Sequence, residues 1–314
     1  MDLAIIEWHH RLGYNIIIAT ENFRKTLDQE FLQLVFFKAL GAMERRFEPR
    51  LWIQEYKGEQ IACYYPGELS GRKIMVLSKD KSRKIAKIVA IDVVMKIRQY
   101  GVENISSIIT PEYVSLIRSM DEEKIPLFVF SEEVKIRLYD LLIKNPVILF
   151  NDLVDMLMTT NSTSASNIKD ILRMFNITGF VDIKYIEGEE VITLNKVFVG
   201  TRRFNKRIIT KFPEMKNEVK EYVSAYELSK ELLHAARCLL IDKYRSFLEY
   251  ATKTDKINTA IFREEVLEYM KKLRYIIMVS EKEAILVSIP IIKEYDIMTG
   301  EKIKEYTISS FPLT

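Results

Sequence analysis

The side chains best suited to bind a ligand lie on one short polar segment near the middle of the chain. The spacing of four apolar residues predicts a helix over 164–175 with one inward face, formed by Ala165, Ile168, Leu172 and Phe175. The side chains left outward are polar or charged: Ser166, Asn167, Lys169, Asp170 and Arg173. Such groups bond base edges and phosphates in duplex DNA. Ser162, Thr163 or Ser164 can cap this helix, and a capped N-terminus also favours a nearby phosphate.

A basic segment follows a short distance downstream. Residues 196–211 contain no acid and six cations, namely Lys196, Arg202, Arg203, Lys206, Arg207 and Lys211. Phosphate binding requires a local concentration of positive charge of this kind. The alternative is a solvated connector whose cations pair with nearby acids, either those of the preceding hairpin or Glu214, Glu218 and Glu221. Surface pairs of that sort stabilise a fold only slightly.

Three helices and a hairpin are expected to position these residues. The first two helices cover 134–144 and 150–158, and a polar turn at 159–163 leads into the helix at 164–175. Two strands then follow, at 179–186 and 191–194, with the sequence EGEE at their turn. A module of this composition can place its third helix in a DNA major groove.

This segment resembles the winged helix-turn-helix domains of bacterial and archaeal transcription regulators. The resemblance implies a DNA-reading helix at 164–175 and a wing at 185–191. The wing departs from the usual basic tip because it carries Glu187, Glu189 and Glu190, which would repel phosphate. Winged helices also serve as assembly pieces in larger complexes, so docking on protein is the alternative to contact with DNA.

The N-terminal part, residues 1–130, alternates strand-like and helix-like runs, which predicts an α/β domain with a partly parallel sheet. Helices are expected around Glu7 and over 82–100, and strands at 105–110 and 126–131. The order also resembles a degenerate nuclease of the restriction-endonuclease or Holliday-junction-resolvase type, with Glu7 on its first helix. The metal-binding aspartate and the paired acid and lysine of that family are missing. A shifted set, Glu55, Glu59 and Asp80, leaves a metal-dependent nuclease as a further alternative.

The C-terminal part, residues 201–314, is predicted to contain the basic connector, a long helical stretch over 213–252 and β-hairpins. A helix followed by a hairpin, at 259–292, resembles the last half of a second winged helix, but no internal repeat is evident in the sequence. Five residues of the helix at 225–251 recur near a heptad: Tyr226, Leu233, Leu240, Phe247 and Tyr250. Either this helix forms a homodimer, or it packs in the core of a monomer.

The bulk composition restricts the function classes further. The 314 residues carry a net charge of +3, too little by itself to indicate a nucleic-acid partner. Two cysteines without a pairing pattern indicate a reducing cytoplasm, and no membrane span or signal peptide is expected. Abundant Ile and Lys favour an archaeal-like or thermophile-like source. Nucleotide-binding and nucleophile motifs are absent, so no cofactor is expected and an enzyme is disfavoured.

Together these features predict an α+β protein with an N-terminal α/β domain at 1–130, a winged helix at 131–200 and a helical, hairpin-containing domain at 201–314. The favoured function is a cytoplasmic transcription regulator that reads double-stranded DNA, with an N-terminal domain that senses a ligand or binds a partner. The alternative is a non-catalytic subunit of a replication, repair or defence complex.

Overall fold

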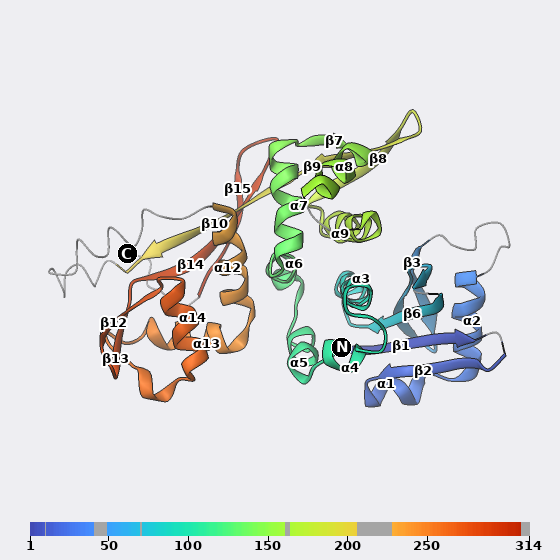
Figure 1. The fold of residues 1–314 in the computed structure, drawn as a ribbon, viewed down its shortest axis with the longest axis horizontal. Helices are drawn as coiled ribbons and strands as arrows, with labels where there is room; N and C mark the ends of the chain where they lie inside the picture. Colours follow the sequence, from blue (N-terminus) through green and yellow to red (C-terminus); the bar gives the residue numbers. More distant parts are fainter. Residues whose placement is uncertain (10, 41–48, 70, 161–163, 206–227, 309–314) are drawn as a thin grey trace. The chain divides into compact units, whose positions relative to one another are not determined.

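The computed structural model describes residues 1–9, 11–40, 49–69, 71–160, 164–205 and 228–308, and its fold is α+β (Figure 1). The chain divides into two compact units, Met1–Ile125 and Pro126–Thr314. The sequence predicted three domains, but the second and third form one unit. The reason is strand pairing, since β10 (Lys196–Phe204) and β14 (Ser288–Asp296) run antiparallel along their whole length.

The N-terminal unit is built on a six-stranded sheet in the order β2-β1-β6-β4-β3, with β5 paired to β6. The strands are β1 (Asp2–His9), β2 (Gly13–Ala19), β3 (Arg50–Tyr56), β4 (Glu59–Tyr65), β5 (Glu68–Leu69) and β6 (Arg72–Lys79). Every strand pair is antiparallel, so the predicted partly parallel sheet is wrong. Hairpins join β1 to β2 and β3 to β4, the latter at the turn Lys57–Gly58.

Helices cover this sheet. Two of them, α1 (Glu21–Thr26) and α2 (Gln29–Leu40), bury Phe23, Phe31 and Phe36 in one core with Ile6 and Leu77 of the sheet. The predicted helix after β6 is α3 (Arg83–Tyr100), which contacts β4 and β6 and ends at Gly101. The elements after it are α4 (Ile105–Ile108), α5 (Pro111–Arg118) and η1 (Glu122–Lys124), then α6 (Ile125–Val129).

Three predicted elements in this region are of the wrong type. The segment around Glu7 is strand β1 and not a helix. The prediction failed because Leu3 to Ile6 are all buried, so the sequence lacks the alternation of apolar and polar residues that identifies a half-exposed strand. The predicted strands at 105–110 and 126–131 contain helices α4 and α6 instead. Short apolar runs do not distinguish a buried strand from a buried helix.

The C-terminal unit begins with a central module, residues 133–194. Its elements are α7 (Glu133–Lys144), β7 (Val147–Leu149), α8 (Phe150–Thr160), α9 (Ala165–Thr178), β8 (Val181–Ile186) and β9 (Glu189–Leu194). The strands form a sheet in the order β7-β9-β8. The three predicted helices and the hairpin are therefore present, and β7 is an additional strand that the sequence analysis did not predict.

A C-terminal module, residues 242–286, repeats this architecture. Its elements are α13 (Asp242–Ala251), β11 (Ile257–Asn258), η3 (Thr259–Ile261), α14 (Glu264–Lys272), β12 (Ile276–Ser280) and β13 (Glu283–Leu286). The sheet order, β11-β13-β12, matches that of the central module. The hairpin predicted after the helix is confirmed, with its turn at Glu281–Lys282. The sequence showed no internal repeat, but the structure contains one.

Equivalent backbone hydrogen bonds align the two modules residue by residue. Phe180 N donates to Phe175 O at 2.8 Å, and Tyr275 N donates to Met270 O at 2.9 Å. The carbonyls of Phe180 and Tyr275 each accept a hydrogen bond from the residue that directly follows the second hairpin strand, at 2.8 Å from Asn195 N and from Val287 N. Phe180 is thus equivalent to Tyr275, and Asn195 to Val287.

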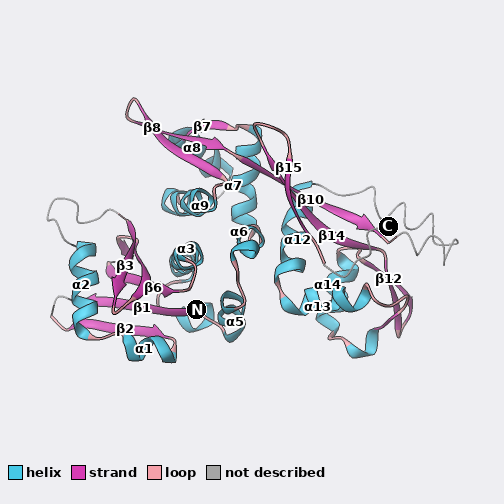
Figure 2. Ribbon diagram, turned by 180° about the vertical axis from the view of Figure 1, so that it is seen from behind, coloured by secondary structure: helices cyan, strands magenta, loops and turns pink. Residues whose placement is uncertain are grey.

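The strand that follows each module joins it to the other module. In Figure 2 the long strands β10 and β14 lie side by side, and β15 (Lys302–Tyr306) pairs with β14 after a turn that contains Thr299 and Gly300. Helix α12 (Leu228–Leu240) contacts β10, β14, α7 and α13. The approach to β10 is close, because a Cβ added to Gly200 would lie 2.3 Å from Leu232 N.

The predicted dimerisation helix at 225–251 is two helices, α12 and α13, which meet at Ile241. Leu233, Leu240 and Phe247 are buried, and the contacts of α12 lie within the C-terminal unit. Its apolar side therefore packs in the core of the monomer, which is the second of the two alternatives. Tyr226 and the other residues of the expected 213–252 helix up to residue 227 lie outside the described residues.

Candidate functional site

The outward side of α9 carries most of the polar residues that were proposed to read DNA. Ser164, one of three residues expected to be able to cap this helix, is the cap, and its hydroxyl accepts a hydrogen bond from Asn167 N at 3.3 Å. Ser166 and Lys169 are exposed, while Asn167 and Arg173 are half-buried. Asp170 was expected to face outward, but it is buried.

Both cations of α9 have carboxylate partners. Lys169 Nζ lies 3.7 Å from Glu190 Oε2 of the wing and 4.7 Å from the centre of the Phe150 ring. Arg173 Nη1 donates to Asp170 Oδ1 at 3.0 Å. Because the Asp170 carboxylate is buried, the positive charge of Arg173 is largely compensated within the helix itself.

The described cations of the basic segment are paired as well. Lys196 Nζ donates to Glu294 Oε1 at 2.7 Å, and Arg203 Nη2 donates to Glu305 Oε1 at 2.6 Å. A phosphate would have to compete with these carboxylates for each cation. The remaining candidates, Lys206, Arg207 and Lys211, lie outside the described residues.

Arg202 forms the most buried of these pairs. Its guanidinium donates to both oxygens of Glu231, at 3.0 and 2.8 Å, and the two side chains are only 8% and 4% exposed. Tyr275 Oη donates to the same carboxylate at 2.9 Å, and burial raises the pKa of this tyrosine well above its usual value. Contact between Arg202 and a phosphate would require this cluster to open.

The acids that neutralise the segment were not identifiable from the sequence. Glu231, Glu294 and Glu305 lie 29 to 102 residues from their partners in the chain. The sequence alternative named acids within the neighbouring hairpin and at 214–221 instead. Only the pairing of β10 with β14, and of β14 with β15, brings Glu294 and Glu305 to the cations.

The wing adds negative charge to the same module. Its strands meet at Glu187 and Gly188, both with positive φ, and Glu187 and Glu189 are exposed. Glu190 accepts a hydrogen bond from Tyr185 Oη and pairs with Lys169. The wing tip therefore presents carboxylates where a DNA-binding wing presents cations.

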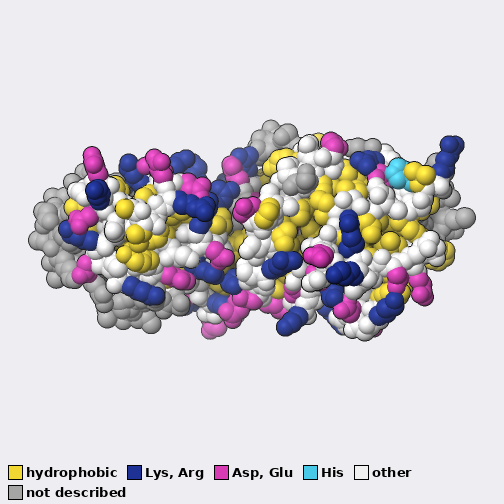
Figure 3. Space-filling model, turned by 90° about the horizontal axis from the view of Figure 1, so that it is seen from below, with side chains coloured by type: hydrophobic (Ala, Val, Ile, Leu, Met, Phe, Trp, Pro, Cys, Tyr) yellow, Lys and Arg dark blue, Asp and Glu magenta, His cyan; other side chains and the backbone are white. Residues whose placement is uncertain are grey.

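The C-terminal module carries charges of both signs at the equivalent places, with Lys271 and Lys272 in the last turn of α14. The first turn of α14 contains exposed Glu264 and Glu265, and Glu268 follows on the next turn. The turn between β12 and β13 contains Glu281 and Lys282. On the face drawn in Figure 3, acidic and basic side chains lie intermixed rather than gathered by sign. Neither module concentrates positive charge around its third helix within the described residues.

The N-terminal unit holds the carboxylates considered for metal-dependent hydrolysis. Glu7 lies on β1, is buried, and accepts from Arg72 Nε and Nη2 at 2.6 Å each. These bonds lower the pKa of Glu7, with smaller contributions from the charges of Arg72 and His9. The Arg72 fork occupies a lone pair on each oxygen of Glu7, so a metal ion would have to compete with this ion pair for the carboxylate.

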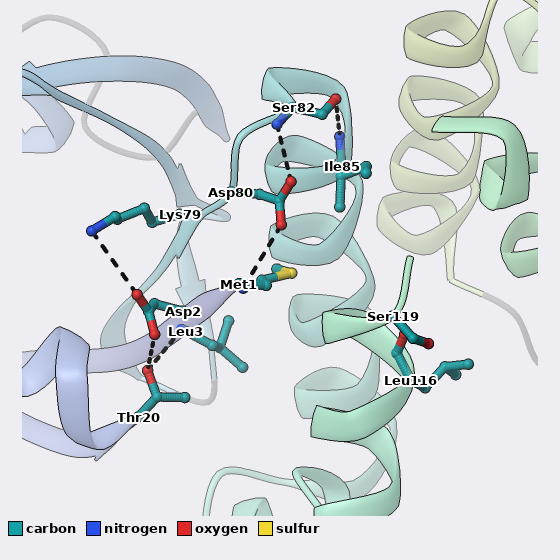
Figure 4. A network of polar contacts seen from close by, with 10 residues as sticks. All are labelled: Met1, Asp2, Leu3, Thr20, Lys79, Asp80, Ser82, Ile85, Leu116 and Ser119. Carbon is teal, nitrogen blue, oxygen red and sulfur yellow. Dashed lines mark hydrogen bonds and ion pairs between the residues drawn. The ribbon is translucent and has the colours of Figure 1, made fainter. Parts of the chain in front are cut away.

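The shifted set of carboxylates is also engaged. Glu59 pairs with Lys79 at 2.6 Å, and Glu55 lies 4.0 Å from Arg83. Asp80 accepts from Ser82 N at 3.0 Å and lies 3.9 Å from the N-terminal amine, as Figure 4 shows. Among the described residues, no group of three or more His, Cys, Asp or Glu side chains is placed to hold a metal ion.

No protein-family model, curated protein or solved structure matches this chain. Function must therefore be argued from the geometry above. Within the described residues, no helix combines the length and the apolar character needed to cross a bilayer.

Proposed function

We propose that this protein is a non-catalytic assembly subunit that binds other proteins through two winged-helix modules. The support for winged helices is the element order, a helix, a strand, a helix, a third helix and a hairpin, with the first strand added beside the second strand of the hairpin. The repeat supports the same assignment for the C-terminal module, in which the helical turn η3 replaces the second helix.

One observation carries the choice of protein over DNA. Each described cation of the candidate DNA surface lies within 4 Å of a carboxylate: Lys169, Arg173, Lys196, Arg202 and Arg203. Non-specific duplex affinity comes from cations that replace condensed counterions on phosphates. Cations that are already neutralised by the protein's own acids supply little of that affinity, and the acidic wing opposes it.

A binding experiment and a crosslinking experiment test this proposal together. In the first, a fluorescein-labelled duplex is titrated with the full chain between about 50 and about 200 mM salt. We expect no saturable binding at either salt concentration. Saturable binding with a steep salt dependence, abolished by Lys169→Glu with Arg173→Glu, would overturn the proposal.

In the second, p-benzoylphenylalanine replaces Tyr185, which is 72% exposed on the wing, in cells that naturally produce the protein. Tyr100, an exposed tyrosine at the end of α3, is the matched control position. We expect an adduct at position 185 that protease removes and nuclease does not. A nuclease-sensitive adduct, or no adduct specific to position 185, would contradict the proposal.

A further inference from the structure

The strand register shows which residues lie on each of the two faces of the central sheet β7-β9-β8. The face toward the helices carries Ile148, Ile192 and Leu194, and the last two are fully buried. The opposite face carries Val147, which pairs with Thr193, and Leu149, which pairs with Val191. We refer to Val147, Leu149 and Val191 as the outer apolar patch.

The outer apolar patch is open to solvent. Val147 is 65% exposed, and Leu149 and Val191 are half-buried. Ile186, 53% exposed, lies on the same face, next to Lys184 in the strand and diagonal to Val191. Soluble proteins seldom leave several adjacent β-branched and aliphatic side chains uncovered without a binding role.

The C-terminal module shows what these positions look like when they face water. The backbone alignment makes Val191 equivalent to Glu283, and Leu149, which pairs with Val191, equivalent to Asn258, which pairs with Glu283. Val147 is then equivalent to Lys256. Lys256 Nζ donates to Glu283 Oε2 at 2.8 Å, and both side chains are almost half exposed. The same fold therefore accepts polar residues at all three positions.

The C-terminal module also shows how such a sheet face is covered. Its apolar outer residues are Ile277, Ile285 and Val287, and Phe204 packs against them from the end of β10. Asn205 N bonds to Val287 O at 2.9 Å and fixes this extended segment beside the sheet. The outer sheet face of this module is thus covered by an extended segment that carries an aromatic side chain, preceded by two arginines.

The charges around the outer apolar patch indicate which charge a binding partner should carry. Glu189 lies on the same face beside Val191, Glu187 lies at the wing tip, and Asp182 is exposed on the same face. Lys184 is the one cation that β8 and β9 supply there. A complementary partner therefore combines an apolar side chain with flanking Lys or Arg residues.

We propose that the outer apolar patch docks an extended segment of another protein, in which an aromatic or aliphatic residue is flanked by Lys or Arg. This inference rests on the proposed function and names the surface and the partner chemistry for the central module. The covered C-terminal sheet face provides the intramolecular precedent.

Random peptides displayed on phage and panned against the full chain test the proposal. We expect enriched peptides to combine an aromatic or aliphatic residue with neighbouring Lys or Arg. A synthetic consensus peptide should lose at least about tenfold in affinity for the variant Val147→Lys with Val191→Glu, which copies the pair Lys256 and Glu283. The matched control, Lys256→Ala, should change the affinity by less than about twofold.

Several results would overturn the inference. One is enrichment of acidic or purely polar peptides, and another is equal peptide affinity for the wild type and the Val147→Lys, Val191→Glu variant. A dimer in sedimentation that this variant dissociates would replace the partner with a second copy of the chain. If the protein adduct at position 185 survives in the variant while the peptide result fails, the proposed function stands and only the docking surface is wrong.

Discussion

The central and C-terminal modules share one architecture and differ in how they treat the outer face of their sheets. The central module has an uncovered apolar patch of Val147, Leu149 and Val191, where the C-terminal module has an ion pair and an asparagine. The C-terminal module has its apolar residues at the other end of this face, where Phe204 covers them. The fold therefore leaves the residues of the outer sheet face free to vary.

The modules also close their cores differently. Phe180 of the central module stacks on Phe130 with ring centres 5.4 Å apart and packs against Phe175 and Phe198. Its equivalent, Tyr275, carries a hydroxyl that bonds Glu231, which in turn holds Arg202. The core around Phe180 in the central module thus depends on aromatic packing. The core around Tyr275 in the C-terminal module depends on a buried ion pair, in which each charge must keep its partner.

The largest effect is expected from breaking that compensated charge. Glu231→Gln removes the carboxylate that pairs with the buried Arg202 guanidinium, so the free energy of unfolding should fall by about 3 kcal/mol. The matched control, Glu305→Gln, removes the partner of the less buried Arg203 and should cost less than about 1 kcal/mol. Urea unfolding measures both values. Equal losses would show that burial of the Arg202 pair is unimportant.

A smaller loss is expected where the two modules are joined. Gly200 lies in the middle of β10, opposite Ile292, and Leu232 leaves no space for a Cβ. Gly200→Ala should therefore lower the free energy of unfolding by about 1–3 kcal/mol through overpacking. Thr201→Ala, one residue away and half-buried, is the control, and it should cost less. An unchanged stability in Gly200→Ala would mean that α12 moves away without penalty.

These contacts explain how far the sequence alone could lead. The helical period of Ile168, Leu172 and Phe175 correctly predicted α9 because such signals are local, although Ala165, which was expected on the same inward face, is exposed. The strand β1 was missed because both of its faces are buried. The repeat was missed because equivalent positions such as Phe180 and Tyr275 share backbone hydrogen bonds rather than residue type.

The candidate site was harder to predict than the fold. Outward placement of Ser166 and Lys169 followed from the helix period, but Asp170 turned out to be buried. The neutralisation of Arg202 depends on Glu231, whose position is set by the packing of α12 on β10. The outer apolar patch depends on β7, which is only three residues long and gives almost no periodic signal.

The stability of the C-terminal module should depend on pH more strongly than that of the central module, because His234 contacts α14. His234 on α12 bonds Tyr269 of α14 at 3.4 Å, and burial, then the charges of Arg237, Arg202, Lys272 and Lys230, lower its pKa from 6.5 to about 4. The unfolded chain binds this proton more readily, so stability should fall as the pH is lowered from about 6.5 to about 4. The slope from this single group is at most about 1.4 kcal/mol per pH unit.

Hydrogen exchange at several pH values measures this effect in each module. Amides of α14 should lose protection in that range before amides of α9 do, and His234→Gln should remove the difference. Equal loss of protection in both modules, unchanged in His234→Gln, would indicate that other groups dominate the acid response.

The smallest change in stability is expected from exchanging the outer faces of the sheets. Lys256→Val with Glu283→Val gives the C-terminal module the central module's residues at two of the three positions. Because the removed ion pair is exposed, the free energy of unfolding should change by less than about 1 kcal/mol. The consensus peptide should nevertheless bind with a stoichiometry of two per chain instead of one, as measured by calorimetry. A stoichiometry that stays at one would show that the binding surface is defined by Leu149 or by the neighbouring acids Asp182, Glu187 and Glu189, and not by Val147 and Val191.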